Sequence, residues 1–213
     1  MIILVGGEKG GTGKTTLSTN LSAMRANAGK DVLLVDTDQQ SSAAYWCGTR
    51  DENKIQPRIS CVQYFGKGFV GQIKDLSRRY DDVFIDAGGR DSTELRDSFL
   101  ISDLVVIPLS PSQYDIWTLS RMHDLVEKST GFNQELRVLI VINRASSNPA
   151  IKESADAKKA LEEFGHLILS KAVIKDRIAF RKGVPNGLGV TEQTPIDEKA
   201  VSELAVLYSE IFP

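Results

Sequence analysis

The stretch that decides the fold is Lys9-Gly10-Gly11-Thr12-Gly13-Lys14-Thr15-Thr16. The apolar run Ile2–Val5 comes before it, and a helical pattern follows. Glycines let successive backbone N–H groups turn inward around phosphate oxygens, and the next helix points its N-terminus at the same anion. The segment therefore predicts a phosphate-binding loop, with Lys14 placed for the β- and γ-phosphates and the Thr15 hydroxyl for Mg²⁺. The residues expected to hold the nucleotide phosphates are Gly10, Gly11, Thr12, Gly13, Lys14, Thr15 and Thr16.

Short apolar runs alternate with helical patterns along the whole chain. The expected strands are residues 2–5, 32–35, 59–65, 83–85, 104–109, 138–142 and 167–173. Most of these runs are continuously apolar, which is typical of strands covered on both faces. The alternation predicts an α/β fold, a doubly wound and mostly parallel sheet with helices on both faces, in a single domain over residues 1–213. Ligands of such sheets bind at the carboxyl ends of the strands.

Helical periodicity is clear in four segments, 17–28, 116–126, 157–164 and 195–212. Gly29 is expected to end the first segment. Ser112 and Asp115 form a candidate capping pair for the second. Thr194 is expected to cap the last helix, with Pro195 as its first residue.

Composition sets few limits on function. The chain has 213 residues and a formal charge of −2, so the overall charge does not point to nucleic acid. Two cysteines, Cys47 and Cys61, are too few for a disulfide framework or a four-ligand zinc site, and we expect reduced thiols in a cytoplasmic protein. The N-terminus lacks a secretory pattern, and no apolar run approaches the roughly 18 residues that a membrane span needs.

Three acidic residues follow predicted strands. Asp36 and Asp38 lie in Asp36-Thr37-Asp38-Gln39-Gln40, and Asp86 ends the apolar run 83–85. Because the carboxyl ends of parallel strands share one edge, these carboxylates are expected near the phosphate loop, where they can hold Mg²⁺ and position water. Ala87-Gly88-Gly89 follows, and its glycines are expected to let the backbone approach a γ-phosphate.

The phosphate loop resembles that of the deviant Walker ATPases of the ParA/MinD family. The string K-G-G-x-G-K-T carries the additional lysine of that family, Lys9, and Glu8 stands where the standard pattern G-x-x-x-x-G-K-[ST] requires glycine. The Asp36 motif is similar to the family's D-x-D-P-Q, with Gln39 in place of proline and Trp46 downstream. Residues 102–115 resemble S-D-L-x-I-I-P-x-x-P-S-x-x-D, and 189–192 resemble the family's C-terminal end. The short plasmid-partition ParA proteins are the most similar group.

The resemblance implies a role for each site residue. Lys9, Lys14 and Asp38 are the implied catalytic residues: Lys9 reaches the partner's nucleotide in a face-to-face homodimer, and Asp38 orients the attacking water. Thr15, Asp36 and Asp86 are implied at the Mg²⁺ site. Asn143, in Val141-Ile142-Asn143-Arg144, is implied to hydrogen-bond adenine.

The implied function is an ATP-dependent DNA-partition ATPase with ATP/ADP and Mg²⁺ as cofactors. ATP binding drives the dimer and nonspecific DNA binding, and slow, partner-stimulated hydrolysis releases the DNA. The implied partners are a second copy of the chain, nonspecific DNA and a ParB-like centromere-binding adaptor, and not a membrane. The implied location is the cytoplasm, in association with the nucleoid.

The most basic short stretch supplies the candidate DNA contacts. These residues are Lys171, Lys175, Arg177, Arg181 and Lys182, and Lys152, Lys158 and Lys159 form a weaker second group. Phosphate contacts predict binding that is sequence-tolerant and salt-sensitive. An ordinary solvated face remains the alternative interpretation.

Three other functions fit parts of the sequence. A MinD-like positioning ATPase would end in a basic amphipathic membrane helix, whereas the last helix here carries Glu198, Glu203 and Glu210 against Lys199. A P-loop amide-forming ligase would need a small-substrate site, and no motif supplies one. An iron–sulfur carrier would need paired cysteines near a dimer axis, a spacing that Cys47 and Cys61 do not show.

Overall fold

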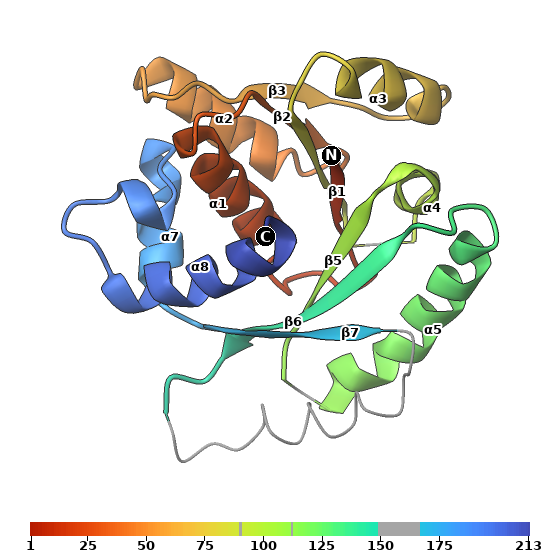
Figure 1. Cartoon of the computed structure of the whole chain (residues 1–213). Helices are drawn as coiled ribbons and strands as arrows, with labels where there is room; N and C mark the ends of the chain where they lie inside the picture. The colour runs from red at the N-terminus through yellow and green to blue at the C-terminus, as the bar shows by residue number, and fades with distance from the viewer. Residues whose placement is uncertain (90, 112, 149–166) are drawn as a thin grey trace.

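The computed structural model describes residues 1–89, 91–111, 113–148 and 167–213, with the backbone path alone for 113–121. Its sheet has seven strands: β1 (Ile2–Val5), β2 (Val32–Asp36), β3 (Ser60–Gln63), β4 (Asp82–Asp86), β5 (Leu104–Leu109), β6 (Arg137–Ala145) and β7 (Ile168–Lys175). Their order is β3-β2-β4-β1-β5-β6-β7, and every neighbouring pair is parallel (Figure 1). Because β1 is the middle strand, the loop that follows it leaves from the middle of the sheet's carboxyl edge.

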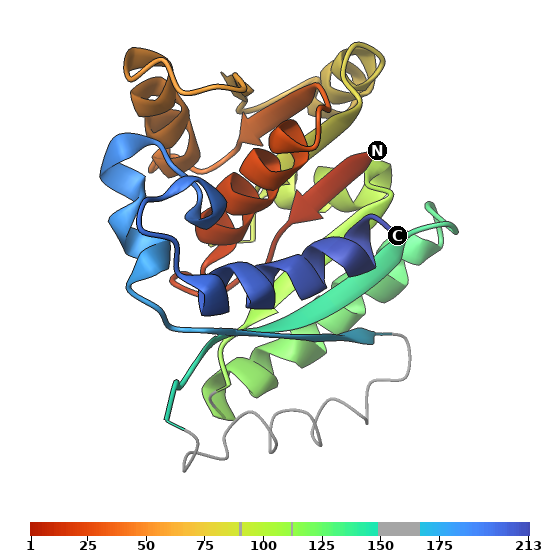
Figure 2. The same ribbon diagram turned by 60° about the vertical axis from the view of Figure 1, so that its left-hand side comes forward.

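Helices cover both faces of this sheet. They are α1 (Lys14–Asn27), α2 (Ser42–Glu52), α3 (Phe69–Ser77), α4 (Thr93–Ile101), α5 (Gln113–Thr130), α7 (Ala179–Lys182) and α8 (Glu198–Ile211). Successive strand side chains point to opposite faces. Ile3 and Val5 of β1 accordingly join a core with α1, α2 and α8, whereas Ile2 and Leu4 join a second core with α3, α4 and α5. Figure 2 shows α1 and α8 together on the near face. The predicted doubly wound parallel sheet is confirmed.

The predicted elements agree with the structure except at several ends. The predicted strand 59–65 is shorter, Ser60–Gln63, and the predicted strand 138–142 is longer, Arg137–Ala145. Gly29 follows the end of α1 with φ +80°. Both cysteines are free thiols. Among the described helices, none is long and apolar enough to cross a bilayer. The predicted helix 157–164 and the capping residue Ser112 lie outside the described residues.

The predicted start of the last helix is wrong. α8 begins at Glu198, and its N-cap is Asp197, not Thr194. The Asp197 carboxylate accepts hydrogen bonds from the backbone N–H groups of Lys199 and Ala200, both at 3.1 Å. A carboxylate that satisfies two of the orphan N–H groups of the first turn is a strong cap, so the helix starts there rather than at Pro195.

A buried ion pair fastens α2 to the C-terminal segment, which contains the short 3₁₀ turns η1 (Val184–Asn186) and η2 (Val190–Glu192). The Arg50 side chain is 1% exposed, and two of its nitrogens lie 2.7 Å from the two carboxylate oxygens of Glu192. It also donates to the carbonyls of Pro57 and Gly187. Nearly every donor of this guanidinium therefore has a partner, which is what a buried charge requires.

Candidate functional site

The loop between β1 and α1 has the geometry of an anion cradle. Gly11 and Gly13 adopt φ of +76° and +94°, and α1 begins at Lys14. The Lys14 side chain is buried, and its Nζ donates to the carbonyl of Lys9 at 2.7 Å. Burial lowers the pKa of Lys14, and the nearby carboxylates of Asp86 and Asp38 oppose that shift. The loop thus curls around a buried ammonium at a helix N-terminus, which suits a polyphosphate.

A carboxylate and two hydroxyls meet beside this loop. Thr15 Oγ1 donates to Asp86 Oδ2 at 2.7 Å, and Ser18 Oγ donates to Asp86 Oδ1 at 2.9 Å. Asp86 is fully buried, and desolvation raises its pKa to about 7 in spite of these hydrogen bonds. A buried carboxylate next to a hydroxyl offers the hard oxygen donors that Mg²⁺ prefers, so these residues fit the ion. Sequence reasoning missed Ser18, although its position three residues after Thr15 places both on one helix face.

The two aspartates after β2 have different surroundings. Asp36 is buried, and its two oxygens accept backbone hydrogen bonds from Asp38 at 3.0 Å and Ala44 at 2.9 Å. Burial raises the pKa of Asp36. Asp38 is half-buried and lines the cavity next to the phosphate loop. Asp36 thus fixes the turn that presents Asp38, and its direct role at Mg²⁺ stays a prediction.

Gly89 makes the closest backbone approach in the site. A Cβ atom at Gly89 would lie 2.7 Å from Gly10 Cα, whereas a Cβ at Gly88 would lie 3.5 Å from the Asp38 carboxyl carbon. The sequence predicted that these glycines let the backbone approach a phosphate. In the structure, the segment after β4 packs directly against the phosphate loop, so a side chain at Gly89 would displace the loop, and the approach to a γ-phosphate stays a prediction.

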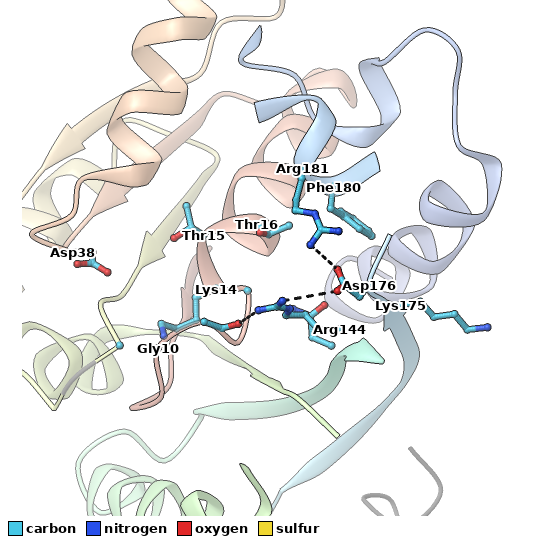
Figure 3. Close-up of a pocket in the computed structure, with 14 residues that line it drawn as sticks. Gly10, Lys14, Thr15, Thr16, Asp38, Arg144, Lys175, Asp176, Phe180 and Arg181 are labelled. Carbon is cyan, nitrogen blue, oxygen red and sulfur yellow. Dashed lines mark hydrogen bonds and ion pairs between the residues drawn. The ribbon is translucent and has the colours of Figure 1, made fainter. Parts of the chain in front are cut away.

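One cavity of about 340 Å³ joins the phosphate loop, Asp38 and Gly89 to residues from the far half of the sheet (Figure 3). Its phosphate end consists of the loop, Asp38 and Gly89. Its other end, here called the base end, consists of Asn143, Arg144, Lys175, Asp176, Phe180 and Arg181. Its position at the carboxyl ends of central strands is the expected ligand position in an open α/β sheet.

Asn143 contacts the phosphate loop from the end of β6. It is buried, and its Nδ2 donates to the carbonyl of Thr12 at 2.6 Å. The predicted adenine contact stays a prediction, since this side chain lines the cavity as well. Sequence reasoning missed Arg144, Asp176 and Phe180 as cavity residues. Arg144 follows Asn143 in a strand-end motif and could have been noticed, whereas the other two carry no local signal.

The basic stretch proposed for DNA is divided among three environments. Lys175 and Arg181 line the cavity. Arg177 is paired with Glu203 through two hydrogen bonds, of 3.0 and 2.6 Å, and is largely buried. Lys171 and Lys182 are exposed, and their contact with DNA stays a prediction. Lys152, Lys158 and Lys159 lie outside the described residues.

Known proteins share this fold and part of this sequence. Residues 3–190 match the CobQ/CobB/MinD/ParA nucleotide binding domain. The maintenance of carboxysome distribution protein A of Halothiobacillus neapolitanus is 26% identical over 208 residues, which cover 96% of this chain and 93% of that protein. The chromosome partitioning protein ParA of Myxococcus xanthus is 44% identical over 175 residues, 64% of this chain and 62% of that protein.

A solved structure shows the same fold. The septum site-determining protein MinD of Pyrococcus horikoshii, complexed with Mg-ADP, has a TM-score of 0.74 and 19% sequence identity, and the match covers 99% of this chain and 95% of that one. The phosphate loop, the parallel sheet and a domain match over most of the chain agree with one another. This chain therefore belongs to the CobQ/CobB/MinD/ParA nucleotide-binding domain family.

Proposed function

We propose that this ParA/MinD-type ATPase segregates DNA. In this proposal Mg-ATP drives a face-to-face dimer, the dimer binds DNA nonspecifically, and hydrolysis releases it. The observation that carries the proposal is that Lys14, Thr15 and Asp38 line one cavity, with Asp86 hydrogen-bonded to Thr15 and the additional lysine, Lys9, in the same loop. These are the groups that phosphoryl transfer needs for charge stabilisation and for positioning water.

Each residue has a defined part in the reaction. Lys14 would exchange the Lys9 carbonyl for phosphate oxygens, and Thr15 with Asp86 would hold Mg²⁺. Bound Mg²⁺ supplies charge neutralisation on the phosphate oxygens. Asp38 would orient the attacking water, and Asn143 would contact adenine. Because charge spreads over the transferred phosphate, a further cation from a second copy would accelerate the step, and that part is assigned to Lys9.

The loop is accessible enough for such a dimer. Gly10 and Gly11 next to Lys9 are exposed at the carboxyl edge of the sheet. Two copies that face each other across this edge would double the number of exposed basic residues such as Lys171 and Lys182 on one rigid body. This doubling should raise the DNA affinity of a chain whose own net charge is −2, since duplex affinity rises with the number of phosphates neutralised together. A ParB-like adaptor would then stimulate hydrolysis and release the dimer from the nucleoid.

A second candidate is the positioning of a protein assembly. It is favoured by the carboxysome-distribution relative, whose similarity covers 96% of this chain. The ATPase cycle would be the same, and only the cargo and its adaptor would differ.

The decisive experiment measures DNA binding in the ATP and ADP forms of the protein. Asp38→Ala is expected to bind ATP, lose most hydrolysis and stay dimeric on DNA, because only the water-positioning step is removed. Asp75→Ala is the matched control, an exposed carboxylate on α3.

Light scattering gives the mass of the protein in each nucleotide state, and anisotropy titrations at several salt concentrations give the DNA affinity. The ATP form should bind DNA more tightly than the ADP form, with a log–log salt slope that grows by about 0.9 per added phosphate contact. Identical DNA binding in ATP and ADP, or none in ATP, would exclude DNA partition.

A further inference from the structure

Two consecutive side chains at the end of β6 contact the same phosphate loop. Asn143 donates to the carbonyl of Thr12, and Arg144 Nη1 donates to the carbonyl of Gly11, both at 2.6 Å. Figure 3 shows the Arg144 guanidinium between the loop and Asp176. In a regular strand, successive side chains point to opposite faces. Both can reach the loop only where the strand departs from regular geometry.

The departure is present at this position. The pairing of β6 with β7 shifts register between Ile142 and Ala145. Arg144 has φ +57°, in the left-handed region that L side chains seldom adopt. Such a backbone persists where surrounding contacts hold it, and it gathers at functional sites. The contacts here are the Gly11 carbonyl and the Asp176 carboxylate, which lies 3.9 Å from Arg144 Nη2 and 3.5 Å from Arg181 Nη1.

The orientation of the carbonyls decides the shape of a phosphate loop. Loop N–H groups converge on an anion when the carbonyls point away from it, and a side-chain donor that holds such a carbonyl favours this arrangement before the anion binds. Arg144 supplies the donor for Gly11, whose φ is +76°, just as Asn143 does for Thr12. We propose that Arg144 is a positioning residue that pre-forms the phosphate cradle through the Gly11 carbonyl. The inference rests on the proposed nucleotide binding and goes beyond it.

This role predicts which part of a ligand loses affinity. Arg144 acts on the loop, so its removal should weaken the binding of phosphates and not of the base. The side chain is 46% exposed, and water competes for the bond, so we expect about a fivefold rise in the dissociation constant. Lysine keeps N–H donors and a positive charge, so Arg144→Lys should recover most of the loss, whereas Arg144→Met should not.

The test uses the full chain and three variants: Arg144→Met, Arg144→Lys and, as a matched control, Arg137→Met. Arg137 is an exposed arginine at the opposite end of the same strand. Fluorescence anisotropy of a labelled ADP gives the affinity, and competition with unlabelled ADP and with inorganic tripolyphosphate separates base from phosphate. Melting temperatures of all variants identify any loss that is due to unfolding.

The expected result is an equal, about fivefold, loss of ADP and tripolyphosphate affinity in Arg144→Met, with wild-type values in Arg137→Met. A loss for ADP with unchanged tripolyphosphate affinity would overturn the inference and give Arg144 a base contact. Equal affinities of Arg144→Met and the control would overturn it while the proposed function stands. A wild-type protein that binds neither ligand would overturn the proposed function, and the inference with it.

Discussion

The two ends of the cavity are built on different principles. At the phosphate end the charges of Lys14 and Asp86 are buried. At the base end the ion pairs of Asp176 with Arg144 and Arg181 are exposed, with side-chain exposures of 41–63%. Buried charges interact strongly and tolerate little change, whereas exposed pairs are screened by water and contribute little each. From this difference we expect substitutions at the phosphate end to change nucleotide affinity more than substitutions at the base end. Asn143 links the two ends through its hydrogen bond to the Thr12 carbonyl.

The largest effect is expected at the phosphate end. Lys14→Ala removes the ammonium that would bridge the β- and γ-phosphates, and two charge-assisted hydrogen bonds of about 2 kcal/mol each correspond to roughly a thousandfold loss of ATP affinity. Lys30→Ala, an exposed lysine just after the same helix, is the control. Titration of labelled ATP measures the loss. Equal ATP affinities in both variants would mean that Lys14 does not contribute to ATP binding.

The next effect is expected at the buried ion pair of Arg50 and Glu192, which joins α2 to the C-terminal segment. Glu192→Gln leaves the Arg50 guanidinium buried without its carboxylate, which should lower the free energy of unfolding by about 3 kcal/mol. Glu198→Gln, exposed at the start of α8, is the control. Chemical denaturation at pH 7 compares them, and an unchanged stability would mean that α2 does not hold the C-terminal segment in this way.

The same pair predicts a pH dependence. Burial opposes ionisation of Glu192, but the hydrogen bonds from Arg50 and the Gly189 N–H outweigh it, so the pKa of Glu192 lies below its usual 4.5. A depressed carboxyl pKa stabilises the fold above pH 4.5 and loses that contribution as the pH falls through the folded-state pKa. Wild type should therefore lose stability below pH 4.5 more steeply than Glu192→Gln.

The smallest effect compares two neighbouring glycines. A methyl group at Gly89 would meet the Gly10 backbone at 2.7 Å, so Gly89→Ala must shift the phosphate loop. Overpacking of this kind costs about 1–2 kcal/mol, which predicts about a tenfold loss of ATP affinity. Gly88→Ala makes an ordinary 3.5 Å contact with Asp38 and should bind ATP like wild type. If both alanine variants bound equally well, the close approach would have no role in forming the cradle.

The phosphate end was predictable because it is local. Residues 9–16 are contiguous, and glycine spacing, a lysine and a threonine specify a loop and a helix start without distant contacts. The strands were predictable for a similar reason, since continuous apolar runs mark strands that are buried on both faces. Asp38 and Asp86 could be placed near the loop because carboxyl ends of parallel strands share an edge.

The base end was decided by the tertiary structure. Arg144, Asp176 and Phe180 come from β6, the turn after β7 and α7, and only the strand order and the irregular pairing of β6 with β7 bring them to one cavity. The basic stretch shows the same limit: composition identifies the cations, but the partner of Arg177 is Glu203, 26 residues away. A sequence pattern records local backbone preference and burial, whereas the pairing of distant charges depends on the packing of separate elements.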